Sequence, residues 1–301
     1  MIKIKKEINK EAKFYEINAN NLITCNLCPH KCLIPADKTG ICGVRRNDGK
    51  ILIAESYGIV TSLALDPIEK KPLYHFYPGS KILSLGSYGC NFHCGFCQNH
   101  HISMDYTDYT DYAEHAQYHK LTPEEIAAAS LEFAARENIG MAYTYNEPLI
   151  NFEFIYDCAE LILKQNQKNI LVTNGYINPE PLEILLPFIQ AMNIDLKSFN
   201  PRFYKEIGGG LDGVMATVER AAKSCHVEVT TLVIPGKNDS VEEMQKLSKW
   251  LAGISKNIPL HISRFFPSHK WRHISATPVE TIYRLVDAAR ENLSYVYPGN
   301  C

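Results

Sequence analysis

Hydrophobic positions follow two alternating periods along the chain from about residue 80 onward. Short apolar runs suited to buried strands occur at residues 81–86, 140–145, 169–173, 192–196, 227–234, 260–263 and 295–297. Between them, apolar residues recur with helical spacing at residues 122–138, 149–165, 181–189, 214–224, 240–251 and 278–292. Strands that alternate with helices of this length predict a parallel sheet covered by helices. We therefore predict an α/β fold, a partial (β/α)6 TIM-like barrel.

The first part of the chain lacks this alternation. Residues 1–80 carry four cysteines of their own, and a hairpin-like pair of strands is predicted around residues 51–54 and 59–65. We predict a small N-terminal Cys-rich, metal-binding region over residues 1–80 and the barrel over residues 81–301. An Asp-Tyr-Thr repeat within residues 104–120 has no apolar period and predicts a solvated loop beside the barrel.

Composition and charge narrow the class of protein. Among 301 residues, 46% are hydrophobic and 21% charged, which is ordinary for a globular protein, and the formal net charge of −2 gives no basic field for nucleic acid or a membrane surface. No apolar run reaches the ~18 residues that span a bilayer, and the charged N-terminus lacks a signal-peptide core. The ten cysteines favour metal binding over disulfides. These features predict a cytoplasmic protein without a nucleic-acid or membrane partner, in an oxygen-poor cell.

The candidate chemistry begins with one cysteine run. Cys90, Cys94 and Cys97 have the spacing C-x3-C-x2-C and directly follow the first predicted barrel strand. Three thiolates on one tight loop can hold three corners of a 4Fe-4S cluster and leave the fourth iron open, and an open position marks a reactive centre. The alternative is a zinc site that a neighbouring histidine completes. A loop at the end of such a strand is where a βα barrel places its active site.

A second cysteine set lies near the N-terminus. Cys25, Cys28, Cys32 and Cys42 fall within one stretch that also contains glycines and prolines. Four soft ligands without an obvious open position predict a closed tetrahedral zinc site or a second iron–sulfur cluster. Free reduced thiols are the remaining interpretation, and the spacing does not choose between zinc and iron.

The first cysteine run, with an aromatic residue before its last cysteine, resembles the signature of radical SAM enzymes. In that family, S-adenosylmethionine (SAM) occupies the free iron, and one electron from the cluster releases a 5′-deoxyadenosyl radical. The resemblance implies that Phe96 flanks the adenine. The family's Gly-Gly-Glu element, which binds the methionine amino group, is replaced here by Asn-Glu-Pro, so the role carries over to Glu147 with Asn146 beside it.

Later strand ends resemble those of glycyl-radical activating enzymes. The resemblance implies that Asn174, Asp195 and Lys197 meet the ribose and carboxylate of SAM. A Phe-Phe-Pro-Ser-His stretch resembles the late Leu-Leu-Pro-x-His stretch of those enzymes and makes His269 a further candidate cofactor contact.

Nearly the whole chain resembles the radical SAM component of the AmmeMemoRadiSam system, a group related to pyruvate formate-lyase activating enzyme. The likeness rests on Cys-Pro-His-x-Cys at residues 28–32, Gly-x-Cys-Gly-Val-Arg at 40–45, the cysteine run at 89–103, Tyr-Thr-Tyr-Asn-Glu-Pro at 143–148, and residues 234–239 and 263–267. It implies an enzyme that abstracts hydrogen from an unidentified small-molecule or protein substrate. A flavodoxin or ferredoxin would supply electrons, and proteins of the same system would be partners.

Two other functions are kept beside this one. The first is a glycyl-radical enzyme activase that acts on a partner protein. The second is a metal-binding or electron-transfer module without catalytic activity, which would hold clusters but not bind SAM.

Overall fold

The computed structural model describes residues 10–104 and 118–301. Most of the Asp-Tyr-Thr repeat that we predicted as a solvated loop, residues 105–117, lies outside the described residues. In the part of the chain that is described, no helix is both long and apolar enough to cross a membrane.

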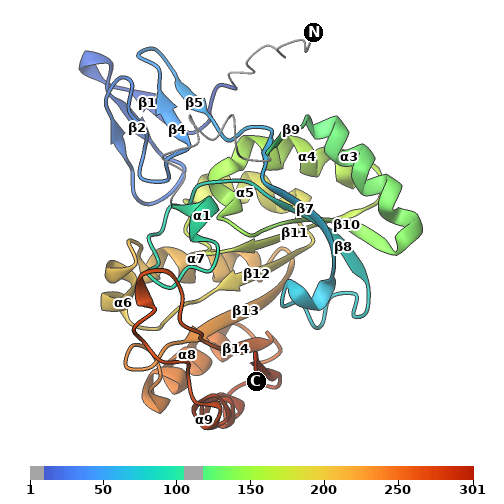
Figure 1. The fold of residues 1–301 in the computed structure, drawn as a ribbon, viewed down its shortest axis with the longest axis vertical. Coiled ribbons are helices and arrows are strands. Elements are labelled where there is room, and N and C mark those ends of the chain that lie inside the picture. Colours follow the sequence, from blue (N-terminus) through green and yellow to red (C-terminus); the bar gives the residue numbers. More distant parts are fainter. Residues whose placement is uncertain (1–9, 105–117) are drawn as a thin grey trace.

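The molecule is built on one eight-stranded sheet in the order β15-β14-β13-β12-β11-β10-β8-β7 (Figure 1). Its strands are β7 Ser62–Pro67, β8 Lys81–Gly86, β10 Asn138–Tyr143, β11 Lys168–Thr173, β12 Ala191–Asp195, β13 His226–Val233, β14 Leu260–Arg264 and β15 Val296–Gly299. All neighbours from β8 to β15 are parallel, and only β7 is antiparallel to its neighbour. Over the described residues β7 and β15 are the two edges of this sheet, so the barrel is not closed. The predicted α/β class with a mostly parallel sheet is confirmed.

Helices follow the parallel strands, as the periodicity predicted. They are α1 His100–Ser103, α3 Pro123–Glu132, α4 Phe152–Lys164, α5 Pro179–Leu185, α6 Pro201–Glu206, α7 Leu211–Ala221, α8 Val241–Ile254 and α9 Val279–Arg290. Short 3-10 turns are η1 Ala19–Asn21, η2 Ile68–Lys70, η4 Phe133–Arg136, η5 Pro148–Asn151, η6 Leu186–Phe188 and η7 His269–Trp271. The start of α3 is fixed by a capping box, because Thr122 and Glu125 each accept a backbone N–H of the other.

The N-terminal part forms small antiparallel sheets at one end of the molecule (Figure 1). They comprise β1 Tyr15–Ile17, β2 Ile23–Cys25 and β3 Leu33–Ile34, and β4 Arg45–Asn47 with β5 Leu52–Ala54. Separately, β6 Ile59–Val60 pairs with β9 His119–Lys120, which follows the cysteine run in the chain. Strands form at both predicted stretches, residues 51–54 and 59–65, but their predicted pairing as a hairpin is wrong, because β5 pairs with β4 and β6 with β9. The turn lies before β5 instead, where the Asp48 carboxylate accepts the N–H groups of Lys50 and Ile51 and joins β4 to β5.

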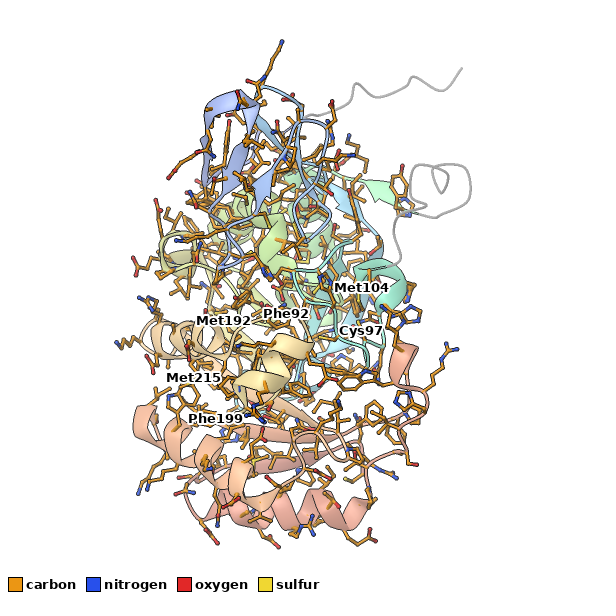
Figure 2. All side chains as sticks on the ribbon, turned by 90° about the vertical axis from the view of Figure 1, so that its left-hand side faces the viewer. Phe92, Cys97, Met104, Met192, Phe199 and Met215 are labelled. Carbon is orange, nitrogen blue, oxygen red and sulfur yellow. The ribbon has the colours of Figure 1, made fainter. Side chains whose placement is uncertain are left out.

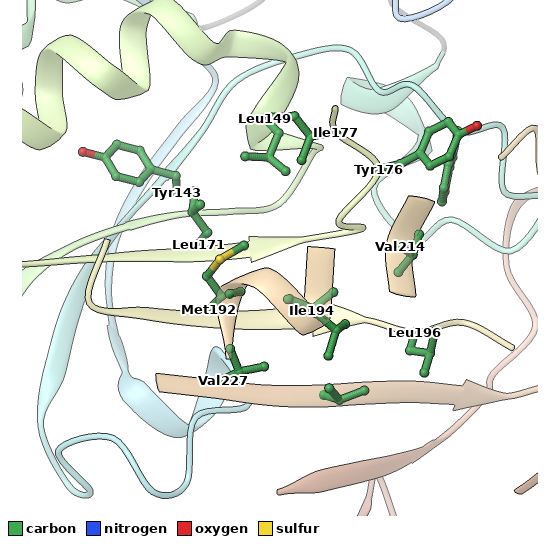
Figure 3. Packing of buried hydrophobic residues seen from close by; sticks show 14 of the residues in the cluster. Tyr143, Leu149, Leu171, Tyr176, Ile177, Met192, Ile194, Leu196, Val214 and Val227 are labelled. Atoms are coloured by element: carbon green, nitrogen blue, oxygen red, sulfur yellow. The ribbon is translucent and has the colours of Figure 1, made fainter. Parts of the chain in front are cut away.

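Buried apolar residues fix the strand ends that carry the candidate site. Leu171 on β11, Met192 and Ile194 on β12 and Val214 on α7 belong to one core cluster, seen between the strands and the covering helices in Figure 3. A close-packed protein core allows little movement of its strands relative to one another. The polar residues that follow each strand are therefore held in fixed relative positions.

Candidate active site

The first cysteine run forms the loop between β8 and α1. Figure 2 shows Phe92 and Cys97 near the middle of the molecule, below the N-terminal sheets. Cys94 is buried, and Cys90 and Cys97 are half-buried. Burial raises the pKa of the Cys94 thiol to about 12 and also raises the pKa values of Cys90 and Cys97. Nearby negative charges add to the rise: those of Glu147 and the other two thiolates act on Cys90, those of Cys97 and Asp195 on Cys94, and that of Asp195 on Cys97. A strongly electropositive centre such as a metal cluster is what would keep such thiols deprotonated.

The three thiols share one cavity of about 390 Å³ with the polar strand ends. Every barrel residue that we predicted as a ligand or cofactor contact lines this cavity except His269; the lining ones are Cys90, Cys94, Phe96, Cys97, Asn146, Glu147, Asn174, Asp195 and Lys197. The volume lies within the usual range for a small-molecule site.

These thiols suit a cluster by their arrangement. Within the described ranges, no three His, Cys, Asp or Glu side chains come together as a site for a single metal ion. A 4Fe-4S cluster binds each thiolate at a different iron, so its ligands need not converge on one point. Three cysteines on one loop that line one cavity together with Glu147, Asp195 and Lys197 are a donor set that fits the cluster with a cofactor beside it.

Glu147 supplies the carboxylate of the cavity. Its oxygens accept hydrogen bonds from the Thr173 hydroxyl at 2.6 Å, the Asn174 N–H at 2.7 Å and the Leu149 N–H at 2.9 Å. The residue is 3% exposed, and burial raises its pKa to about 7 even though these hydrogen bonds favour the charged form. A carboxylate so held is a suitable partner for an ammonium group.

Two asparagines brace the cysteine loop. Asn146 donates from Nδ2 to the carbonyl oxygens of Tyr88 and Gly89, both at 3.0 Å. Asn174 donates from Nδ2 to Asn91 Oδ1 at 2.8 Å and lies 3.9 Å from Cys90 Sγ. These asparagines thus connect the ends of β10 and β11 to the loop that follows β8.

An ion pair and an aromatic group form the wall beyond β12. Lys197 Nζ lies 2.9 Å from Asp195 Oδ2 and 5.7 Å from the centre of the Phe96 ring. Phe96 in turn packs against Trp271, with ring centres 5.2 Å apart. Trp271 has no local sequence signal, but its backbone N–H donates to the Gly95 carbonyl oxygen within the cysteine run, which ties η7 to the loop.

His269 takes a different position from the one we predicted. Its ring stacks on His100 with centres 4.3 Å apart, and it is not among the residues that line the cavity. The neighbouring Ser268 hydroxyl donates to the carbonyl oxygen of Cys97. This segment therefore contacts the outside of the cysteine loop.

The four N-terminal cysteines lie near one another as a second group, although in the described residues no three of them are gathered closely enough to hold a single metal ion. Burial raises the pKa of Cys28 to about 12 and that of Cys42 to about 11, and in each case the charges of the other cysteines add to the rise. Cys25 and Cys32 are joined by a backbone hydrogen bond of 2.9 Å, and the Ile41 N–H lies 3.5 Å from Cys32 Sγ. This N–H directed at sulfur favours the thiolate form of Cys32.

Comparisons with known proteins identify the class. Residues 85–250 match the radical SAM superfamily. An uncharacterized protein of Methanocaldococcus jannaschii, MJ0808, is 41% identical over 296 residues, which cover 97% of this chain and 85% of the relative.

Solved structures show the same fold. A radical SAM methyltransferase from Sphaerobacter thermophilus has a TM-score of 0.53 at 18% identity, covering 74% of this chain and 67% of the other. SuiB of Streptococcus suis, bound to S-adenosylmethionine, has a TM-score of 0.53 at 14% identity, covering 71% and 48%.

The chain belongs to the radical SAM superfamily. It is an enzyme of that class, which uses a 4Fe-4S cluster and SAM with electrons from an external reductant. The predicted class is thereby confirmed, together with the 4Fe-4S cluster and SAM as its cofactors.

Proposed function

We propose that this protein is the radical SAM component of an AmmeMemoRadiSam-type system and acts on a substrate still to be identified. When bound, the cluster and SAM supply a 5′-deoxyadenosyl radical that abstracts hydrogen. The observation that carries the proposal is the single cavity in which the cysteine run, Glu147 and the Asp195–Lys197 pair meet.

Each group has a defined task in this proposal. Cys90, Cys94 and Cys97 hold the cluster and leave one iron for SAM. Glu147 receives the methionine ammonium, since it is the buried carboxylate of this wall. A further set orients the ribose, the carboxylate and the adenine: Phe96, Asn146, Asn174, Asp195 and Lys197. We keep His269 as an indirect contributor, because it supports the loop from outside.

We also propose a division of the chain. Residues 81–301 form the partial (β/α)6 barrel, and residues 1–80 form a Cys-rich region whose strand β7 completes the sheet. Within it, Cys25, Cys28, Cys32 and Cys42 would bind zinc or a second iron–sulfur cluster. Its strands of two or three residues bury little on their own, and such small units depend on a metal or on packing against a larger body.

The proposed electron donor, partner proteins and compartment follow from the redox chemistry of this class of enzyme. A flavodoxin or ferredoxin would deliver the electron, and proteins of the AmmeMemoRadiSam system would be partners. None of the ten cysteines, which all lie within the described residues, forms a disulfide, and the proposed location is a reducing cytoplasm. The activase alternative keeps the same cavity and differs in its substrate, a glycyl-radical partner protein.

The test is formation of 5′-deoxyadenosine from SAM and dithionite by anaerobically reconstituted protein. Cys94→Ala should abolish the product, whereas Cys225→Ala should retain it, because Cys225 lies at the end of α7 outside the cavity. Continued product formation by Cys94→Ala would contradict the proposal. Incubation with a glycyl-radical enzyme then distinguishes the two candidate functions. Only an activase would leave a stable glycyl radical on that partner, and EPR detects this radical.

A further inference from the structure

The cavity extends away from the cysteine loop to a basic end. Lys70 and Lys71, at the end of η2, line it together with the cluster cysteines. Their partner Asp66 lies on β7 opposite Ile82, four residues before β8 ends at Gly86. At about 3.3 Å per residue, this places Asp66 about 13 Å along the strand from the start of the cysteine loop.

Lys71 is a buried cation held in place from two sides. Its side chain is 3% exposed, and Nζ donates to Asp66 Oδ2 at 2.8 Å. The ammonium lies 4.7 Å from the centre of the Tyr145 ring, and the Tyr145 hydroxyl donates to the same carboxylate oxygen at 2.8 Å. Lys70 approaches the other oxygen of Asp66 at 3.4 Å, and its side chain is 67% exposed.

These charges do not cancel. Two ammonium groups share one carboxylate, so this end of the cavity carries a net positive charge. Asp66 is not among the lining residues, whereas both lysines are. A cation in a cavity wall favours an anionic ligand, because charge-assisted hydrogen bonds are the strong ones.

The proposed cofactor site does not account for this excess of positive charge. At the other end, the Asp195 and Lys197 charges offset each other, Glu147 faces the proposed ammonium position, and the thiols belong to the cluster. The lining also includes Leu232, Ser263 and Asn300, to which the proposed SAM site assigns no task.

We propose that Lys70 and Lys71 bind an anionic group of the substrate, a carboxylate or a phosphate, and so hold its reactive carbon toward the cluster end. Asp66, which does not line the cavity, and Tyr145, which does, position Lys71. The inference rests on the proposed function, because the opposite end is taken as the SAM site. It names the class of substrate as a small anion or an anionic segment of a larger molecule.

The experiment uses calorimetric titration of reconstituted, SAM-saturated protein with three probes: inorganic phosphate, succinate and the neutral succinamide. We expect phosphate or succinate to bind at least tenfold more tightly than succinamide, and the preferred anion shows whether the group is a phosphate or a carboxylate. Lys70→Met and Lys71→Met should each raise the Kd of that anion about tenfold or more, whereas Lys71→Arg should retain most of the affinity.

Lys164→Met is the matched control, because Lys164 also pairs with a carboxylate, Glu160, but lies outside the cavity. It should leave the Kd unchanged. If Lys71→Met does not fold, the result for Lys70→Met decides, because replacing an exposed lysine costs little stability.

The inference is overturned if anions bind no better than succinamide, or if the lysine variants bind them as the wild type does. In either case, 5′-deoxyadenosine formation by the wild type shows whether the proposed SAM site still stands. Anion binding that depends on Lys70 and Lys71 in a protein that forms no 5′-deoxyadenosine would count against the proposed function instead.

Discussion

His30 Nε2 donates a hydrogen bond of 2.8 Å to the carbonyl oxygen of Asn91, the residue that follows the first cluster cysteine. His30 lies between the second and third cysteines of the N-terminal group, so this bond joins the two cysteine sets. Its ring also packs edge-on against Tyr176, which follows β11. The N-terminal region is thus part of the support of the cysteine loop.

Loss of this bond should weaken the support measurably. His30→Ala should lower the free energy of unfolding by about 1 kcal/mol, as for other single hydrogen bonds. The reconstituted variant should also lose iron faster to a chelator. His30→Gln is the control, because its amide can still donate. Equal iron loss in all three proteins would show that the bond does not support the loop.

Gly89 gives a second test of the same contact. It has φ +84°, and a Cβ there would lie 2.6 Å from Val44 Cγ1 and 2.7 Å from the Cys42 carbonyl oxygen. Gly89→Ala should therefore reduce the iron bound per chain and lower stability by well over the ~1–2 kcal/mol cost of a left-handed backbone. Gly79→Ala isolates that backbone cost, because Gly79 has φ +79° and open space around it. Equal effects of the two variants would contradict the predicted overlap.

Glu147 should make the cluster-free protein less stable as pH rises. Its pKa is raised by burial to about 7 in the fold, so the folded state holds this proton more tightly than the unfolded chain. The resulting stabilisation is complete below the ordinary glutamate pKa and is lost as pH rises through about 7, a change on the order of 3 kcal/mol. Denaturant unfolding of wild type and Glu147→Gln at pH 5 and pH 8 measures it. Parallel pH profiles would refute the prediction.

Glu228, at the opposite end of the sheet, should have the reverse effect: it should make the protein less stable as pH falls. Burial alone would raise its pKa, but hydrogen bonds from His226 and His261 outweigh this and lower the pKa to about 2. The carboxylate therefore contributes stability above the ordinary glutamate pKa, and the contribution is lost as pH falls toward 2. Glu228→Gln should cost about 2–3 kcal/mol at pH 7 and progressively less below pH 4.5.

The exposed Glu219 provides the control for this measurement. Glu219→Gln should change stability by less than about 0.5 kcal/mol at either pH. A constant difference between wild type and Glu228→Gln from pH 7 to pH 3 would show that the Glu228 carboxylate does not have the predicted low pKa.

The sequence predicted the barrel elements well because each is long enough to show a period. Every parallel strand from β8 to β15 was found within about two residues of its position, and the long helices that follow were found as well. Strands β1 to β3 have two or three residues each and show no period, and α6 has six residues. The hairpin error came from the side chain of Asp48, which forms a turn that the apolar pattern does not show.

The residues of the site could be predicted from the sequence where they belong to recognisable local motifs. The cysteine spacing located the loop, and the resemblance to radical SAM and glycyl-radical activating enzymes singled out Glu147, Asn174 and the Asp195–Lys197 pair, which line the same cavity. Lys71 and Trp271 were missed, because each reaches the site from a segment distant in sequence and without a recognisable motif. Only the folded chain brings η2 to the same cavity and η7 next to the loop after β8.

The position of β7 has a practical consequence for protein engineering. A truncation that began at residue 81 would remove β7 and leave β8 as an exposed edge strand with unpaired backbone groups, a known route to aggregation. It would also strip Val44 and Cys42 from behind Gly89. The barrel and its N-terminal cysteines therefore have to be expressed together if the catalytic loop is to be studied in its native shape.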